Sequence, residues 1–186
     1  NGDGNPDDGI DGWRLDVAEK VDQNFWRDFR IWVRRINPDA YLVGEVWWED
    51  WDAGKMFNAA PWLQGDVFDA VMNYRWAREA FEFFAGPSST RTATAFVNRL
   101  QELLHDYPDA ANAVLMNLYD SHDTDRMASH IVNADFPYDK DIVSSHPRYR
   151  LRKPTAGERE IQKLMALFQM TYLGAPMIYY GTEVRL

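Results

Sequence analysis

The chain has 186 residues, 46% hydrophobic and 26% charged, a balance typical of soluble globular proteins and unlike collagen-like, disordered or disulfide-rich chains. It carries 20 Lys and Arg against 29 Asp and Glu, a formal net charge of −9, so we expect neither nucleic acid nor an anionic membrane surface as a partner. The absence of cysteine excludes thiol nucleophiles and Cys-ligated zinc, and no apolar run approaches the roughly 18 residues that span a bilayer.

The first part of the chain predicts a strand, a helix and a second strand. An apolar run at 12–17 precedes a segment whose apolar residues recur at spacings of three and four, which is typical of a helix. Asp22 is the expected N-cap, and Asn37-Pro38 ends the helix because proline disfavours helical geometry in the residue before it. A second apolar run follows at 41–46.

The same alternation continues to the end of the chain. Further strands are predicted at 68–74, 113–119 and 176–180, and further helices from about 76 to 84, around 96–104, and after the capping-box pair Thr155 and Glu158. The connections 49–66 and 124–154 lack the expected helix. Loops of that length in a compact fold usually bind ligands or cover a site.

Short apolar strands that alternate with helices imply a parallel sheet covered by helices, either a doubly wound open sheet or a (β/α)8 barrel. No Gly-rich phosphate fingerprint follows a strand, which weakens the dinucleotide-binding form of the open sheet. Polar residues recur instead at the carboxyl ends of strands, at Asp16, Glu45, Asn73 and Asp123. Barrel enzymes place their catalytic groups there, so we predict an α/β chain that is part of a (β/α)8 barrel.

Two of these carboxylates form a candidate catalytic pair. Arg14 and Asp16 lie two apart on a strand and so face the same side; an arginine keeps such a carboxylate ionised and oriented. Glu45 ends the next strand, which predicts neighbouring positions on one rim. Its neighbours Trp47 and Trp48 disfavour a charged carboxyl group. One ionised and one protonated carboxyl group suit glycoside hydrolysis; the alternatives are a structural ion pair and unrelated carboxylates.

A third polar cluster lies on the turn at 120–126, with His122, Asp123, Asp125 and Arg126. It fits a metal site, a clamp for hydroxyl groups, or a solvated loop. A lone histidine among carboxylates lacks the spacing of a zinc motif, so a metal site is disfavoured.

Three segments, in this order, resemble signature regions of the α-amylase family, glycoside hydrolase family 13: DGWRLDVA at 11–18, GEVW at 44–47 and SHDTDR at 121–126. Two more, WLQGDVFDAVMNY at 62–74 and GAPMIYYGTEV at 174–184, resemble its neopullulanase, cyclomaltodextrinase and maltogenic amylase branch. The resemblance thus touches nearly the whole chain.

The resemblance implies a retaining hydrolase of α-glucans such as starch, pullulan, cyclodextrin or maltooligosaccharides, acting through a covalent glycosyl-enzyme. It implies Asp16 as nucleophile, Glu45 as general acid/base and Asp123 as the residue that binds sugar hydroxyls and stabilises the transition state. It also implies that Arg14 orients Asp16 and that His122 contacts hydroxyls of the same sugar. A glucanotransferase of the same family and a non-catalytic sugar-binding or structural relative remain the alternatives.

The aromatic residues divide by position. Four tryptophans that follow Glu45 are placed to stack on glucose rings: Trp47, Trp48, Trp51 and Trp62. Tyr74 and Tyr119 sit at strand ends and are expected to line the cleft. Trp26 and Trp32 lie in a helical pattern and are expected to pack.

The family's first signature region has no counterpart here. We therefore expect residues 1–186 to be a fragment of the catalytic barrel, about strands four to eight, without the earlier strands or any flanking domains, and inactive in isolation. No cofactor is expected for catalysis. The compartment is undecided, with periplasmic or extracellular preferred over cytoplasmic, and a homo-oligomer of the full-length parent stays open.

The opening segment NGDGNPDDGID has the composition of a calcium loop. An EF-hand requires Gly at position six and an acidic residue at position twelve, where this chain has Pro6 and Gly12. A structural Ca²⁺ site of another kind through Asp3, Asp7 or Asp8 and a solvated turn-rich loop are the two alternatives.

Overall fold

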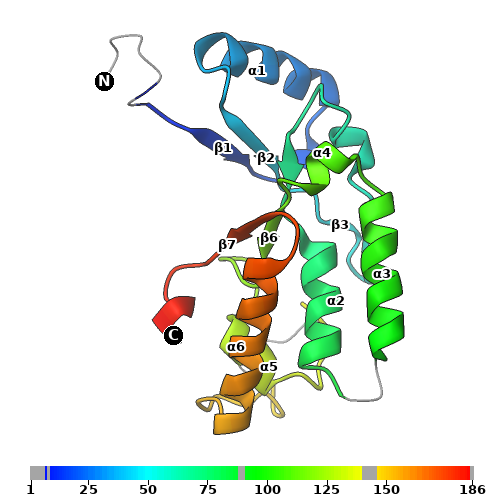
Figure 1. Cartoon of the computed structure of the whole chain (residues 1–186), viewed down its shortest axis with the longest axis vertical. Coiled ribbons are helices and arrows are strands. Elements are labelled where there is room, and N and C mark those ends of the chain that lie inside the picture. Colours follow the sequence, from blue (N-terminus) through cyan, green and yellow to red (C-terminus); the bar gives the residue numbers. More distant parts are fainter. Residues whose placement is uncertain (1–6, 8, 88–90, 140–145, 185–186) are drawn as a thin grey trace. The chain divides into compact units, whose positions relative to one another are not determined.

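A computed structural model describes residues 7, 9–87, 91–139 and 146–184 (Figure 1). The chain divides into two compact units. Unit 1 comprises Asn1–Met72 and Leu104–Met116, and unit 2 comprises Asn73–Leu103 and Asn117–Leu186.

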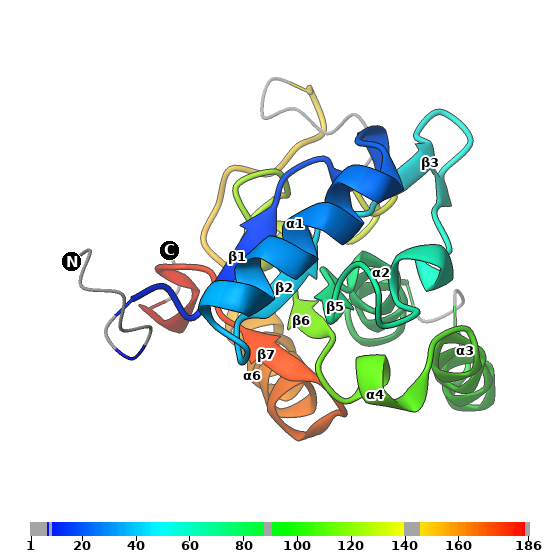
Figure 2. The same ribbon diagram turned by 90° about the horizontal axis from the view of Figure 1, so that it is seen from above.

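Unit 1 is built on a small parallel sheet. Strand β1 (Gly12–Leu15) pairs with β2 (Tyr41–Gly44), which pairs with β5 (Ala70–Val71). Helix α1 (Gln23–Ile36) connects β1 to β2 and lies across them in Figure 2. The predicted strand, helix, strand unit is therefore confirmed. An isolated parallel bridge between Met72 and Met116 extends the pairing beyond β5.

Local sequence signals set both ends of α1. The side chain of Asp22 accepts a hydrogen bond from the backbone N–H of Asn24 at 2.8 Å, and the helix stops at Asn37, whose backbone is extended. Trp26 is buried, and its ring lies 5.4 Å from that of Phe68. Trp32 does not pack as predicted, because it lies on the outer face of the helix and is 69% exposed.

Charged contacts tie α1 to the edge of the sheet. Arg30 and Arg34, one turn apart, contact Oδ1 of Asp69 at 2.9 and 2.8 Å. The other oxygen of Asp69 accepts the backbone N–H of Leu42 at 2.9 Å. A single carboxylate therefore joins the helix to β2.

The connection at 49–66 is more regular than predicted. It contains an antiparallel hairpin of β3 (Trp48–Asp50) and β4 (Lys55–Met56), followed by the short helix η3 (Ala60–Trp62). Gly54 has a φ of 68°, a left-handed conformation that glycine adopts readily in such a turn. Unit 1 also contains two short helices, η2 (Ala18–Lys20) and α4 (Asp109–Asn112).

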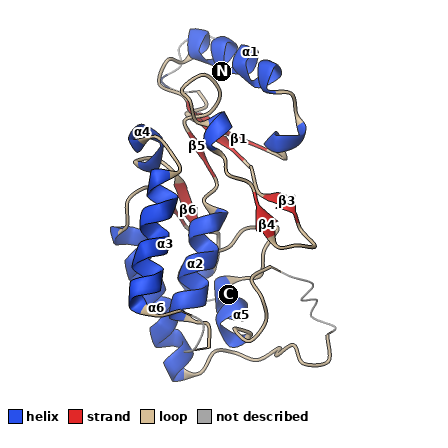
Figure 3. Cartoon of the chain, turned by 90° about the vertical axis from the view of Figure 1, so that its right-hand side faces the viewer, coloured by secondary structure: helices blue, strands red, loops and turns tan. Residues whose placement is uncertain are grey.

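Unit 2 is mainly helical, as the colouring of Figure 3 shows. It contains α2 (Tyr74–Phe84), α3 (Ala93–His105) as far as Leu103, α5 (Met127–Val132), α6 (Ala156–Thr171) and η4 (Thr182–Val184). Strand β6 (Met116–Leu118) pairs with β7 (Ala175–Met177). The predicted strands are thus present but shorter. None of the helices among the described residues is long and apolar enough to cross a membrane.

Aromatic stacking joins the helices of unit 2. The ring of Trp76, on α2, lies 4.9 Å from that of Tyr119 and 5.5 Å from that of Phe168 on α6. Trp76 and Tyr119 are 1% and 2% exposed. Burying such large rings stabilises the unit by several kcal/mol relative to leaving them in water, at about 25 cal/mol per Å².

A buried carboxylate links α2 to the segment that includes α3. The side chain of Glu79 is 1% exposed and contacts Arg91 at 2.7 Å and Arg99 at 3.2 Å. Two cations therefore compensate a charge that would otherwise be costly to bury.

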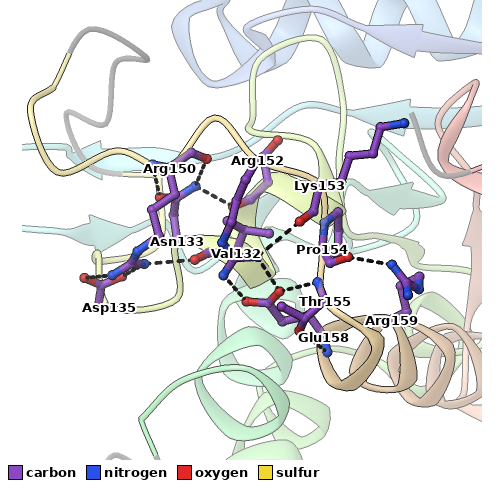
Figure 4. Close-up of polar contacts among 11 residues, drawn as sticks. Val132, Asn133, Asp135, Arg150, Arg152, Lys153, Pro154, Thr155, Glu158 and Arg159 are labelled. Carbon is purple, nitrogen blue, oxygen red and sulfur yellow. Dashed lines mark hydrogen bonds and ion pairs between the residues drawn. The ribbon is translucent and has the colours of Figure 1, made fainter.

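The connection at 124–154 is also more ordered than predicted, because α5 lies within it. Beyond α5, two hydrogen bonds connect the side chain of Asn133 to the backbone of Arg150 (Figure 4). The N–H of Arg150 donates to Oδ1 of Asn133 at 2.8 Å, and Nδ2 of Asn133 donates to the carbonyl of Arg150 at 3.3 Å. The capping box of Thr155 and Glu158 then starts α6 as predicted. Arg152 adds a two-pronged contact to Glu158 at 2.6 and 2.7 Å.

Candidate active site

Arg14 connects the two carboxylates that end β1 and β2. Its Nη1 donates to Oδ1 of Asp16, and its Nη2 donates to Oε1 of Glu45 at 2.5 Å. Both nitrogens belong to one planar guanidinium, so the two carboxyl groups lie side by side. The side chain of Glu45 is 9% exposed and that of Asp16 is 69% exposed, so one is shielded from water while the other faces it.

Backbone contacts also hold Glu45 in place. Its N–H donates to the carbonyl of Leu15, and its own carbonyl accepts the N–H of Ala18, both at 2.9 Å. Its second carboxylate oxygen, Oε2, accepts the backbone N–H of Val17 at 2.9 Å. The pairing of β1 with β2 thus continues past the ends of both strands.

The residue before Glu45 has to be small. A Cβ atom on Gly44 would lie 2.4 Å from two ring carbons of Phe68, and Phe68 is 1% exposed. The missing side chain therefore lets the aromatic core approach the strand that carries Glu45.

The site includes two features that the sequence did not predict. Arg14 was expected to orient Asp16 alone, but it contacts both carboxylates. Glu19 is a third carboxyl group at this site: burial raises its pKa, and the negative charges of Glu45 and Asp16 raise it further. In the sequence, only its position three residues after Asp16 could have indicated that Glu19 lies at this site.

The tryptophans after Glu45 differ in accessibility. Trp47 and Trp48 are partly exposed and stack on each other with ring centroids 5.5 Å apart. Trp51 is 39% exposed. Trp62 is 8% exposed and packs edge-on against Phe57, so it offers no open face, contrary to prediction. Sugar stacking by Trp47 and Trp48 remains a prediction.

In unit 2, His122 and Asp123 lie together on the turn after β6. Nε2 of His122 is 3.0 Å from Oδ2 of Asp123, and their side chains are 59% and 38% exposed. The backbone N–H of Asp123 donates to Oγ of Ser121 at 3.1 Å, and that of Ser121 donates to Oγ1 of Thr124 at 2.9 Å. Local hydrogen bonds thus shape the turn and leave both side chains accessible.

Asp120 anchors this turn, and sequence reasoning missed it. The residue is 2% exposed, and its Oδ2 accepts the backbone N–H of Met127 at 2.9 Å and the hydroxyl of Thr182 at 2.7 Å. Arg126 adds a second anchor, since its guanidinium carbon lies 4.4 and 4.5 Å from the ring centroids of Tyr179 and Tyr180.

Tyr74 and Tyr119 were predicted to line a cleft, and this prediction is wrong. Each is 2% exposed. Tyr74 begins α2 instead of ending a strand, and the hydroxyl of Tyr119 donates to the carbonyl of Met165 at 3.1 Å, so both rings belong to the core of unit 2. Burial raises the pKa of Tyr119 well above its ordinary value.

The remaining predicted residues fall into two groups. Arg14, Asp16 and Glu45 are together in unit 1, as are Trp47 and Trp48 with each other. His122 and Asp123 are together in unit 2.

The predicted calcium loop lies largely beyond the described part of the chain, which includes Asp7 but not Asp3 or Asp8. Within the described part, no group of three or more His, Asp or Glu residues could hold a metal ion.

Comparison with known proteins gives consistent matches. The family described as "Alpha amylase, catalytic domain" matches residues 6–186. The chain is 40% identical over 175 residues to a cyclomaltodextrinase of Geobacillus thermopakistaniensis, covering 94% of this chain and 24% of the relative. It is 41% identical over 178 residues to neopullulanase 2 of Thermoactinomyces vulgaris, covering 95% and 24%.

Among solved structures, the debranching enzyme of Nostoc punctiforme soaked with acarbose is similar with a TM-score of 0.73 and 34% identity, over 96% of this chain and 34% of that one. The chain spans about a quarter of the length of the curated relatives it matches. These matches confirm the predicted fold class, part of a (β/α)8 barrel.

Proposed function

Since the chain belongs to the α-amylase catalytic-domain family, we propose that it supplies the catalytic carboxylates of a retaining hydrolase of α-glucans. The observation that carries this proposal is the bridging of Asp16 and Glu45 by Arg14. Retaining glycosidases need two carboxyl groups on one rim, one to attack and one to transfer protons. A shared guanidinium holds two such groups close together.

In the proposed first step, the carboxylate of Asp16 attacks the anomeric carbon while Glu45 protonates the departing glycosidic oxygen. The bond to the leaving sugar breaks as a glycosyl ester forms on Asp16. The exposure of Asp16, at 69% of its side chain, leaves the nucleophile open to substrate. The carboxyl oxygens of Glu45 accept hydrogen bonds from Arg14 and the Val17 amide, and these contacts hold the buried group in one orientation. The first step requires Glu45 to carry a proton.

In the second step, Glu45 takes a proton from water, and the resulting hydroxide attacks the same carbon and releases Asp16, so configuration is retained. His122 and Asp123 are assigned to sugar hydroxyls, which is supported by their exposure and mutual contact on an anchored turn. Trp47 and Trp48 are assigned to the apolar faces of glucose rings. We propose that neither step uses a cofactor.

The names of the relatives suggest which substrates to test. We propose that cyclodextrin and pullulan are substrates of the full-length protein, because relatives that share about 40% identity are named cyclomaltodextrinase and neopullulanase.

The test uses the full-length protein with both glucans and a maltooligosaccharide. The anomeric form of the first product is read by proton NMR before mutarotation. The proposal predicts an α-anomeric product, strong loss of rate in Asp16→Ala and Glu45→Gln, and reducing sugar as the main product. An inverted product or full activity of Asp16→Ala would refute it. Predominant transfer to a sugar acceptor would instead identify a glucanotransferase.

A further inference from the structure

Val17, the residue directly after Asp16, has a backbone conformation that its side chain disfavours. Its φ and ψ are 45° and 42°, in the left-handed region. A β-branched residue is a genuine outlier there, because its Cβ substituents crowd the backbone. The side chain is 41% exposed, so burial of the valine does not explain the conformation.

The two backbone amides on either side of this left-handed residue both contact Glu45. The backbone N–H of Val17 donates to Oε2 of Glu45, and the next N–H along the chain, that of Ala18, donates to the carbonyl of Glu45, both at 2.9 Å. Two successive amides therefore face the same residue of the neighbouring strand. Consecutive N–H groups around a left-handed residue commonly form a small anion-binding concavity.

The hydrogen bond from the Val17 amide provides a donor for the second carboxyl oxygen of Glu45. Arg14 holds Oε1 at 2.5 Å and the Val17 amide holds Oε2, so each oxygen has its own donor. With both oxygens held, the carboxyl group is restrained from turning about its last side-chain bond.

We propose that Val17 is a positioning residue of the active site, whose left-handed backbone holds its amide on Oε2 of Glu45 and thereby keeps the general acid/base in its working orientation beside Asp16. This inference rests on the proposed function. It concerns the backbone of Val17 and assigns no contact with substrate. Strained backbone at an active site is a recognised means of holding groups in place.

The charged groups around Glu45 come from the β1 segment and the turn after it. Arg14 contacts Glu45 directly, and Asp16 shares that arginine. Glu19, on η2, interacts electrostatically with both carboxylates. A change confined to the Val17 amide leaves these three side chains in place.

The experiment replaces only the backbone N–H of Val17. In the full-length protein, Val17 is exchanged for 2-hydroxyisovalerate, which keeps the side chain but substitutes an ester oxygen for the N–H. The matched control places the same hydroxy acid at Val21, whose N–H donates to the carbonyl of Ala18 at 3.3 Å, away from Glu45. Activity is measured against pH for both proteins.

We expect kcat to fall roughly 10- to 150-fold in the Val17 ester, the range for a hydrogen bond to a charged group. The pH profile of kcat/KM should also change in the Val17 ester, because one of the two donors to the Glu45 carboxyl group is lost. The Val21 ester should show neither change. Coincident profiles for the two esters would overturn the inference. Full activity in Glu45→Gln would instead refute the proposed function.

A second measurement needs no ester. With ¹⁵N-valine labelling, the amide signal of Val17 should change position in Glu45→Gln, whereas that of Val21 should stay in place. An amide signal of Val17 that is unchanged in Glu45→Gln would overturn the inference.

Discussion

Replacing Arg14 with methionine tests whether one cation organises both carboxylates. Methionine has a similar length and fills the site without charge. Because Nη1 serves Asp16 and Nη2 serves Glu45, the change removes two contacts at once. We expect a large loss of activity in a protein that still folds.

The structure sets the size of the effect. The contact with Glu45 is 2.5 Å long and that side chain is 9% exposed, so it should be worth about 1.5–3 kcal/mol, as for other hydrogen bonds between charged groups. The contact with Asp16 should add at most about 1 kcal/mol, because Asp16 is 69% exposed. The Glu45 contribution alone corresponds to a loss of roughly 10- to 150-fold in kcat/KM.

The assay is hydrolysis of maltooligosaccharide by the full-length protein, with Arg27→Met as the matched control. Arg27 pairs with Asp66 at 2.6 Å, but the two side chains are 39% and 46% exposed, so its loss should change stability by about 0–1 kcal/mol and leave the rate within about two-fold. Arg14→Lys should fall between the wild type and Arg14→Met, since lysine keeps the charge but not the fork. Equal rates in Arg14→Met and Arg27→Met, with both proteins folded, would refute this role.

Three further predictions concern stability, each followed by urea unfolding of the full-length protein. Gly44→Ala should cost about 1–3 kcal/mol, because the new Cβ would lie 2.4 Å from the buried ring of Phe68; an unchanged midpoint would contradict this packing. Glu79→Gln should cost about 1–3 kcal/mol, whereas Glu102→Gln should stay within about 0.5 kcal/mol, since their side chains are 1% and 63% exposed; equal losses would count against a buried ion pair. Burial lowers the pKa of His130 to about 4, so the unfolded state binds the proton first as pH falls, and the free energy of unfolding should drop by up to roughly 3 kcal/mol between about pH 6.5 and 4. His130→Phe should remove that part of the pH dependence, and an unchanged dependence would refute the assignment.

Local signals in the sequence were sufficient for α1 and α6. Asp22 caps α1 through its side chain, and Thr155 with Glu158 forms the capping box of α6. These contacts involve neighbours in the chain, so spacing alone predicts them. Parallel pairing of β1 with β2 was predictable for a similar reason, because a short crossover helix leaves few alternatives.

Three features of the fold were not predicted. The hairpin of β3 and β4 consists of very short strands without clear alternation, and α5 lies within a polar stretch. Tyr74 followed an apolar run and so was assigned to a strand end, but tertiary packing places it at the start of α2, 2% exposed.

The active-site geometry was predictable only in outline. Residue types and strand-end positions pointed to Asp16 and Glu45. The second contact of Arg14 depends on the register of the sheet, and the left-handed backbone of Val17 runs against the preference of its side chain. Both require three-dimensional positions that no periodicity encodes.

The central claim, that Asp16 is the nucleophile of a retaining glycosidase, is tested most directly by trapping. The full-length protein is incubated with a fluorinated glycosyl fluoride that forms the glycosyl ester quickly and releases it slowly, and the labelled peptide is sequenced by mass spectrometry. We expect one sugar attached through an ester to Asp16 and no label in Asp16→Ala. A label on Glu45 or another residue, or turnover without a covalent intermediate and with an inverted product, would contradict it.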